Sequence, residues 1–222
     1  MSSSSATPEA AEAARWVSHL EAEESSLELL TFDASTAFAL GSQIRQDYLA
    51  EYYPTGEPRT SSTSSSTSSP PTGIVISIQT LDGQQLFSAQ AGHPACTSAD
   101  NWSWVARKIA TVKRFGRSSF HVGRERVAAG KHLDGGLDPQ EYAAHGGAVP
   151  VYVQGATTAP VAVAVVSGLK QEDDHRLVAE AIQKIAVLQR NQQRLLAQGK
   201  SLSLKTDVEL PPVKKQLIVF DF

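Results

Sequence analysis

The feature that most constrains the fold of this chain is a β-hairpin pattern over residues 73–91, GIVISIQTLDGQQLFSAQA. β-Branched residues dominate positions 74–78, which is typical of a strand. Asp82 and Gly83 form a turn dipeptide, and a second strand pattern follows it. The chain is therefore expected to contain antiparallel strands.

Helical patterns flank this hairpin on both sides. Residues 18–30 and 32–53 are expected to form two helical segments, the second of them capped by Asp33 or Ser35. The second segment carries apolar residues at helical spacing, namely Ala37, Leu40, Ile44 and Tyr48. After the hairpin, the pattern over 97–130 predicts one helix that ends at Gly116 and another that starts near Ser118 or Ser119.

The C-terminal half again contains both helical and strand patterns. Residues 131–147 are expected to form a loop with one helical turn, since Asp138 is a good N-cap and proline follows it. Residues 148–155 and 160–168 are apolar almost throughout, which predicts two strands covered on both faces. A long helix is expected over 172–199, with acids at its start and Gly199 at its end.

This order of elements (helix, strand pair, helix pair, strand pair, helix) predicts an α+β fold. Residues 1–14 are small, polar and acidic, so they are expected to be a disordered extension. Residues 15–199 form one predicted α+β domain, interrupted at 54–72 by a loop rich in serine and threonine. Residues 200–222 remain as a C-terminal tail.

Composition limits the classes of partner. A net charge of −3 argues against a dedicated binder of nucleic acid or of anionic membranes, so small ligands or proteins are the expected partners. No apolar run approaches the roughly 20 residues that span a bilayer. Cys96 is the only cysteine, so no internal disulfide is expected and the predicted location is cytoplasmic.

Three segments resemble one known family: 101–123, NWSWVARKIATVKRFGRSSFHVG; 137–153, LDPQEYAAHGGAVPVYV; and 163–182, VAVVSGLKQEDDHRLVAEAI. They resemble the haem-degrading-domain family of GlcG-like and HbpS-like proteins, and within it the uncharacterised protein family number 0303. The resemblance implies a profilin-like fold, with a central antiparallel sheet flanked by helices, and symmetric homo-oligomers. Haem is the cofactor that the family label implies, although none is assigned to this subfamily. The additional N-terminal, serine-rich and C-terminal segments suggest a fungal member.

Three cations lie on the predicted helix after residue 97. Arg107 and Arg114, seven residues apart, are expected to project together with Lys108 nearby. Such a group suits a clamp for carboxylate or phosphate, because guanidinium groups bind oxyanions through two hydrogen bonds. The alternative is that these side chains pair with acids of a neighbouring subunit or face water.

His145 is the second candidate. It has the chemistry of a general base or an iron ligand, and Glu141 would share its face if the helical turn before it continued. The alternative is structural, because the glycine pair after His145 is typical of a sharp corner into a strand. His145 or His121 would be the axial ligand of a haem. The other histidines lack the spacing of a zinc site, so no metal site is expected.

The tail offers a third candidate, made of Leu217, Ile218, Val219, Phe220, Asp221 and Phe222. These residues would either add a strand to the edge of a neighbouring sheet or present a carboxylate motif to a TPR-type co-chaperone. Two functions follow from the sequence. The favoured one is a cytosolic homo-oligomeric adaptor that uses this tail, and the alternative is a haem-binding or small-molecule-binding protein or enzyme with a pocket near His145.

Overall fold

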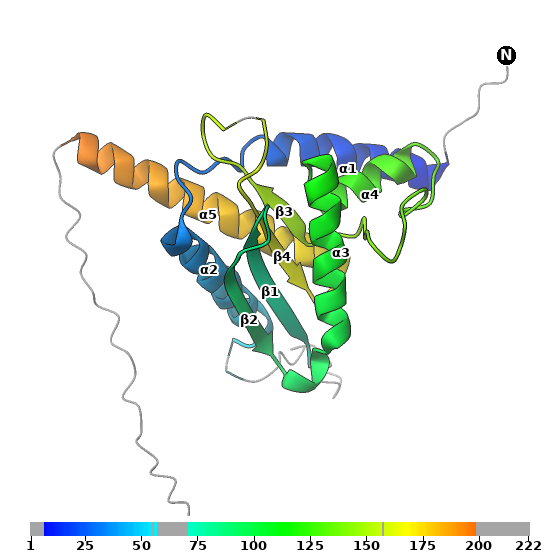
Figure 1. Cartoon of the computed structure of the whole chain (residues 1–222), viewed down its shortest axis with the longest axis horizontal. Coiled ribbons are helices and arrows are strands. Elements are labelled where there is room, and N and C mark those ends of the chain that lie inside the picture. Colours follow the sequence, from blue (N-terminus) through cyan, green and yellow to red (C-terminus); the bar gives the residue numbers. More distant parts are fainter. Residues whose placement is uncertain (1–6, 55, 57–70, 157, 199–222) are drawn as a thin grey trace, which may run out of the picture.

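The structure is a computed structural model that describes residues 7–54, 56, 71–156 and 158–198. Its centre is a four-stranded antiparallel sheet in the order β2-β1-β4-β3 (Figure 1). Strand β1 spans Gly73–Thr80 and pairs with β2, Gln85–Gly92, as the predicted hairpin. Strand β4, Ala162–Ser167, lies between β1 and β3, Ala148–Val151. The predicted α+β class is confirmed.

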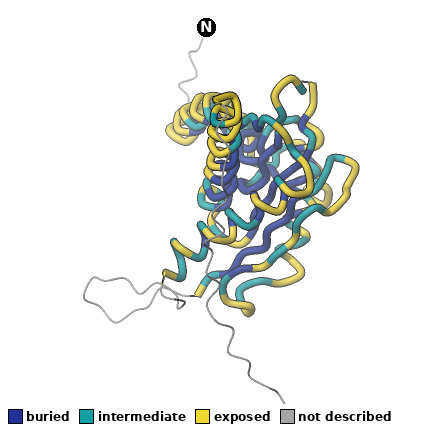
Figure 2. The backbone as a smooth tube through the Cα atoms, turned by 90° about the vertical axis from the view of Figure 1, so that its left-hand side faces the viewer, coloured by how far each residue is buried: buried dark blue, intermediate teal, exposed yellow. Residues whose placement is uncertain are grey.

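Helices cover both faces of this sheet. Consecutive side chains of a strand point to opposite faces, so one strand contributes apolar residues to the cores on both sides. Ile74, Ile76 and Ile78 of β1 pack in a core with the helices α2 and α5. Val75 of the same strand packs in a second core with α3. Strands β3 and β4 are buried throughout, as their apolar sequences predict, and Figure 2 shows the buried residues gathered in the sheet.

The predicted starts of α2 and α4 and the predicted end of α3 are confirmed. Helix α2 spans Ala34–Tyr52, and its N-cap Asp33 accepts a hydrogen bond from the amide of Thr36. Helix α3 spans Ala99–Phe115 and ends at Gly116, which has the left-handed φ of 66°. Helix α4 spans Ser119–Ala128 with Ser118 as N-cap.

The prediction was wrong about the start of the ordered chain. Helix α1 spans Pro8–Glu24 and so begins inside the segment predicted to be disordered. Thr7 caps it and Pro8 occupies its first turn, which suits a residue that has no N–H to donate. Ala10 and Ala13 are buried, so the alanines that suggested disorder form the packed face of the helix. Residues 27–30, predicted as helix, are not helical, and Leu29 forms an isolated bridge with Val153.

Helix α5 spans Gln171–Ala197 and extends past the rest of the molecule at its C-terminal end (Figure 1). Most of the serine-rich segment, Gly199 and the tail with its candidate residues 217–222 lie outside the described residues. In the part of the chain that is described, no helix has the length and apolar character needed to cross a membrane.

Candidate ligand-binding pocket

A pocket of about 290 Å³ opens where α3, the end of β4 and the start of α5 meet. Helix α3 contributes Asn101, Trp104 and Lys108. Their spacing of three and four residues places them on one side of the helix. Lys108 lies next to the apolar stripe of Val105 and Ile109, which packs on the sheet. The lysine is thereby directed toward the interior of the protein.

Lys108 forms a buried ion pair with Asp174 of α5. Only 3% of Lys108 and 2% of Asp174 is exposed. The Lys108 Nζ donates to Asp174 Oδ2 at 3.0 Å and to the carbonyl oxygen of Val166 at 3.2 Å. The backbone amides of Gly168 and Leu169 also donate to the Asp174 carboxylate, at 3.4 and 3.0 Å. Helices from opposite faces of the sheet are thus joined around the end of β4.

Burial raises the pKa of Asp174 to about 6, although the charge of Lys108 and the hydrogen bonds oppose this shift. A buried ion pair costs desolvation energy that well-packed apolar residues would not. Ionisable groups with perturbed pKa values that line a pocket are typical of functional sites. The pair is therefore a candidate functional element.

The glycine pair after His145 explains how the loop reaches this pocket. Gly147 has a φ of 124°, which favours glycine, and a Cβ there would lie 2.7 Å from the Lys108 Nζ. A Cβ at Gly146 would collide with the carbonyl oxygen of Gln171 in the first turn of α5. The absence of side chains at both positions lets the loop pack against α5 and Lys108. The predicted corner into β3 is present, and it also delivers His145 to the pocket.

His145 is held by two neighbours. Its Nε2 lies 3.0 Å from Asp134 Oδ2, and its ring meets Trp104 edge to face with 5.0 Å between centroids. Asp134 is itself fixed, because its Oδ1 accepts from the amide of Ala144 at 2.9 Å. An ionised carboxylate can only accept, so Nε2 carries the proton and no described residue is hydrogen-bonded to Nδ1. With its side chain 32% exposed, His145 can offer Nδ1 to a ligand as an acceptor or base.

Glu141 is not brought to His145. The predicted turn forms, with the Tyr142 amide donating to the Asp138 carbonyl oxygen at 2.8 Å, but it ends there. Glu141 is exposed and outside the pocket lining, because the chain is no longer helical between it and His145. Asp134, and not Glu141 as predicted, is the carboxylate next to His145.

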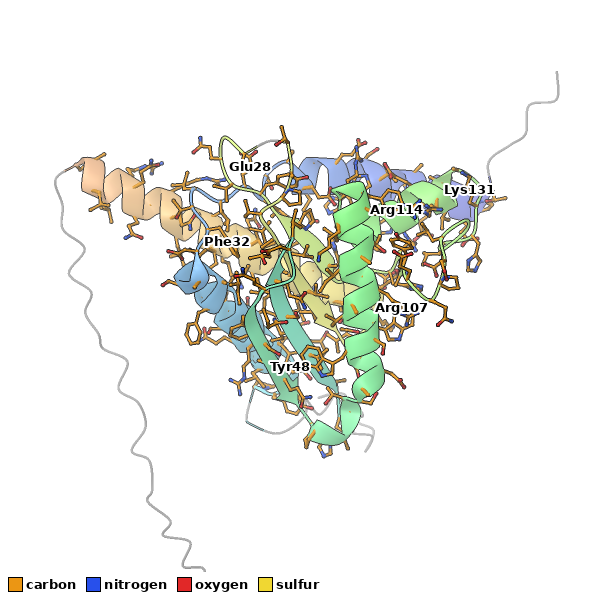
Figure 3. All side chains as sticks on the ribbon, viewed as in Figure 1. Glu28, Phe32, Tyr48, Arg107, Arg114 and Lys131 are labelled. Atoms are coloured by element: carbon orange, nitrogen blue, oxygen red, sulfur yellow. The ribbon has the colours of Figure 1, made fainter. Side chains whose placement is uncertain are left out.

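The three cations of the predicted clamp point in different directions. Lys108 is buried, whereas the Arg107 guanidinium lies 4.2 Å from the ring centre of Trp104 and donates to the Pro139 carbonyl oxygen at 3.0 Å. Arg114 lies 4.8 Å from the ring centre of Tyr142. Both arginines, labelled on α3 in Figure 3, contact the turn after residue 137 and do not line the pocket. A role for them in binding a ligand stays a prediction.

Sequence reasoning missed Asp174, Asp134 and the amide side chains of Asn101 and Gln171. One signal was present: Lys108 lies beside the apolar positions of α3, which indicates a buried cation that needs a buried acid. The acids at the start of α5 suit the positive end of the helix dipole whether they are exposed or buried, so their presence did not indicate that Asp174 is buried. Asp134 carried no such signal, because it lies in an irregular loop.

His121, the other predicted haem ligand, is 1% exposed and both its ring nitrogens are occupied. Nδ1 lies 3.1 Å from Glu24 Oε2, and Nε2 lies 2.8 Å from an Arg117 nitrogen. It is therefore not open to an iron atom. Across the described ranges, no group of three or more His, Cys, Asp or Glu side chains is arranged to hold a metal ion.

Comparison with known proteins identifies the family. The family model described as haem degrading protein HbpS-like matches residues 66–183. The chain belongs to this HbpS-like family. The resemblance found in the three sequence segments is thereby confirmed.

The HbpS-like chain is similar to bacterial proteins named UPF0303. One from Burkholderia mallei is 36% identical over 162 residues, which cover 72% of this chain and 83% of the relative. One from Streptomyces avermitilis is 47% identical over 104 residues, which cover 46% of this chain and only 61% of the relative. These bacterial relatives do not support the suggested fungal origin.

A solved structure supports the same fold. The crystal structure of Ybr137w protein is 30% identical to this HbpS-like chain, with a TM-score of 0.63. The match covers 78% of this chain and 88% of that chain.

The pocket residues do not fit a haem, the group that the family description implies. A haem needs largely apolar walls around an axial ligand. Of the lining side chains only Trp104 and Leu169 are apolar, and a buried ion pair forms part of the lining. No haem chemistry is therefore proposed for this pocket.

Proposed function

We propose that this HbpS-like protein binds a small polar molecule in the pocket between α3 and α5. The observation that carries the proposal is the convergence on one opening of Trp104 and Lys108 from α3, His145 from the loop before β3, and Asp174 from α5. A ligand there would meet fixed polar groups, which is typical of specific small-molecule sites.

The lining favours an uncharged or zwitterionic ligand. Lys108 and Asp174 neutralise each other, so the pair presents no net charge when both are ionised. Asn101 and Gln171 offer their amide NH2 groups as donors, because their oxygens already accept from the backbone amides of Ser98 and Gly146. His145 offers Nδ1 as an acceptor. Trp104 supplies an apolar wall. His145 is the residue best placed for proton transfer, if the bound molecule reacts.

A thermal-shift screen of small polar metabolites tests this function. Compounds that bind should raise the melting temperature of the wild type, and His145→Gln should abolish the rise. His132→Gln is the matched control, since His132 lies in the same loop, is exposed and does not line the pocket. The proposal is wrong if every stabilising compound acts equally on both variants.

Haem is the competing ligand. Titration of the protein with haem should give no shifted Soret band that depends on His145. A band present in the wild type and lost in His145→Gln would contradict the proposal and support the haem-binding alternative.

Homo-oligomeric assembly, a cytoplasmic location and recruitment of a TPR-type co-chaperone stay predictions from the sequence. Together they would make the protein an adaptor, a function separate from ligand binding in the pocket. Deletion of residues 217–222 tests it. Loss of binding to a TPR domain with assembly intact would support recruitment, whereas loss of assembly would support strand addition between subunits.

A further inference from the structure

The lining of the ligand pocket contains a buried side chain that the fold leaves without a polar partner. Ser167, the last residue of β4, is only 4% exposed and lines the pocket. Because side chains alternate along a strand, it lies on the same face as Val165, which packs with α3. Its hydroxyl has no hydrogen-bond partner among the residues that the structure describes, and it remains accessible. A ligand that bonds to this hydroxyl would recover the free energy that its desolvation costs.

Other hydrogen-bond donors lie in the same part of the lining. Lys108 has three N–H groups and uses two of them within the protein. Gln171 offers its side-chain NH2 group, because its oxygen accepts from the Gly146 amide. We call Ser167, Lys108 and Gln171 the donor end of the pocket. A hydroxyl, an ammonium group and an amide NH2 group together suit a carboxylate, which only accepts.

The acid beside the donor end carries no unbalanced charge. Asp174 is paired with Lys108, and two backbone amides donate to its carboxylate. The other acids in the first turn of α5, Glu172 and Asp173, do not line the pocket. The negative charge of Asp174 is therefore compensated within the protein, and a carboxylate of the ligand can approach the donor end.

The pocket has the opposite polarity at His145. Asp134 holds the proton on Nε2, so Nδ1 is an acceptor, and it has no partner within the described ranges. The charge of Asp134 behind the ring favours a cationic donor at Nδ1. Trp104, whose ring meets His145, lies four residues before Lys108 on α3, which corresponds to ~6 Å along the helix axis. The acceptor at His145 and the donor end are therefore about one helical turn apart along α3.

We infer that the ligand of this pocket is a free α-amino acid with an uncharged side chain. The ligand class rests on the proposed function, since it concerns the same pocket. The carboxylate accepts from the donor end, the ammonium group donates to His145 Nδ1, and the side chain contacts Trp104. An α-amino acid carries both charged groups on one carbon, so it reaches both ends of a pocket of only about 290 Å³. Its net charge of zero matches the neutral ion pair in the lining.

Calorimetric titration with amino acids and their derivatives tests the ligand class. The L-amino acids with uncharged side chains are first screened by thermal shift, and the one that stabilises the protein most is titrated. Its α-amide lacks the carboxylate charge, and its desamino acid lacks the ammonium group without added bulk. Each derivative should bind roughly tenfold more weakly or worse, because a hydrogen bond to a charged group is lost. Equal affinity of either derivative would overturn the amino-acid assignment.

Ser167→Ala separates a ligand contact from a role in folding. The melting temperature of the ligand-free protein should not fall, because the hydroxyl has no partner in the described fold. The affinity for the amino acid should fall roughly tenfold. Ser103→Ala is the matched control, since Ser103 is exposed on α3 and outside the pocket lining, and it should keep the wild-type affinity. Unchanged affinity in Ser167→Ala would also overturn the assignment.

The thermal-shift screen distinguishes failure of the ligand class from failure of the pocket function. If other polar metabolites stabilise the protein in a manner that depends on His145 and no amino acid does, the amino-acid assignment is wrong and the pocket function stands. If no compound stabilises the protein in this manner, both are wrong.

Discussion

At the scale of single residues, the pocket depends on the Lys108–Asp174 pair. Removing one member leaves the other charged and buried, whereas removing both leaves space for apolar side chains. Lys108→Met should lower the free energy of unfolding by about 3–5 kcal/mol at neutral pH, and the double variant Lys108→Met/Asp174→Leu should recover most of this loss. Urea denaturation measures both. Equal losses in the single and double variants would contradict the buried-pair interpretation.

The raised pKa of Asp174 predicts how stability depends on pH. Its carboxyl has a pKa of about 6 in the folded protein, against 3.8 as the ordinary value. The folded protein therefore retains a proton that the unfolded chain has lost, and stability falls as the pH rises through this window. At ~1.4 kcal/mol per pKa unit, the wild type should lose roughly 3 kcal/mol between about pH 4 and pH 6, relative to the double variant. Parallel pH profiles of unfolding free energy for the two proteins would refute the assignment.

At the scale of elements, Glu24 joins the end of α1 to the start of α4. Its Oε1 accepts from the amide of Ser118 at 3.0 Å, and its Oε2 lies 3.1 Å from His121 Nδ1. Burial alone would raise the pKa of Glu24, but the hydrogen bonds from His121 and Ser118 outweigh it and the pKa is lowered. The carboxylate is thus stabilised in its charged form.

Glu24→Ala should lower the free energy of unfolding by about 1–3 kcal/mol, because it leaves the buried Ser118 amide and the His121 imidazole without their acceptor. Glu21→Ala is the control on the same helix, since Glu21 is 57% exposed and lies 4.0 Å from Arg117. It should cost less than about 0.5 kcal/mol. Chemical denaturation compares the two, and similar costs would show that α1 is not held at Glu24.

The corner before β3 gives a second prediction about an element. Gly147→Ala places a Cβ against Lys108 at a φ that disfavours alanine, and should destabilise the protein by at least ~3 kcal/mol. Gly155→Ala is the control, because Gly155 has a φ of 85° but nothing within 4 Å of an added Cβ. It should cost only about 1 kcal/mol. Equal melting temperatures for the two variants would show that close packing at Gly147 is unimportant.

Sequence patterns predicted the elements better than the site. The hairpin, the Gly116 break and the Asp33 cap depend on local turn and capping chemistry, and all three are present. The start of α1 was missed because its stability comes from packing on α4 rather than from its own composition. Asp174 was missed because its partner Lys108 is 66 residues away in sequence, and Asp134 because it lies in an irregular loop, where spacing does not indicate which side chains meet.

At the scale of the whole molecule, the pocket exists only where both layers of helices meet. Helix α3 covers one face of the sheet and α5 the other, and they approach each other at the end of β4 (Figure 1). The ligand site and the stability of the two-layered fold therefore depend on the same ion pair. A ligand that contacts this region would stabilise the fold as a whole.

The most direct test of the ligand pocket is the fluorescence of Trp104. The variant Trp16→Phe/Trp102→Phe leaves Trp104 as the sole tryptophan of the chain. Titration with the compound that stabilises the wild type most should change the emission of Trp104 saturably, and His145→Gln in the same background should abolish the change. Binding that leaves the emission unaltered would contradict a ligand site between α3 and α5.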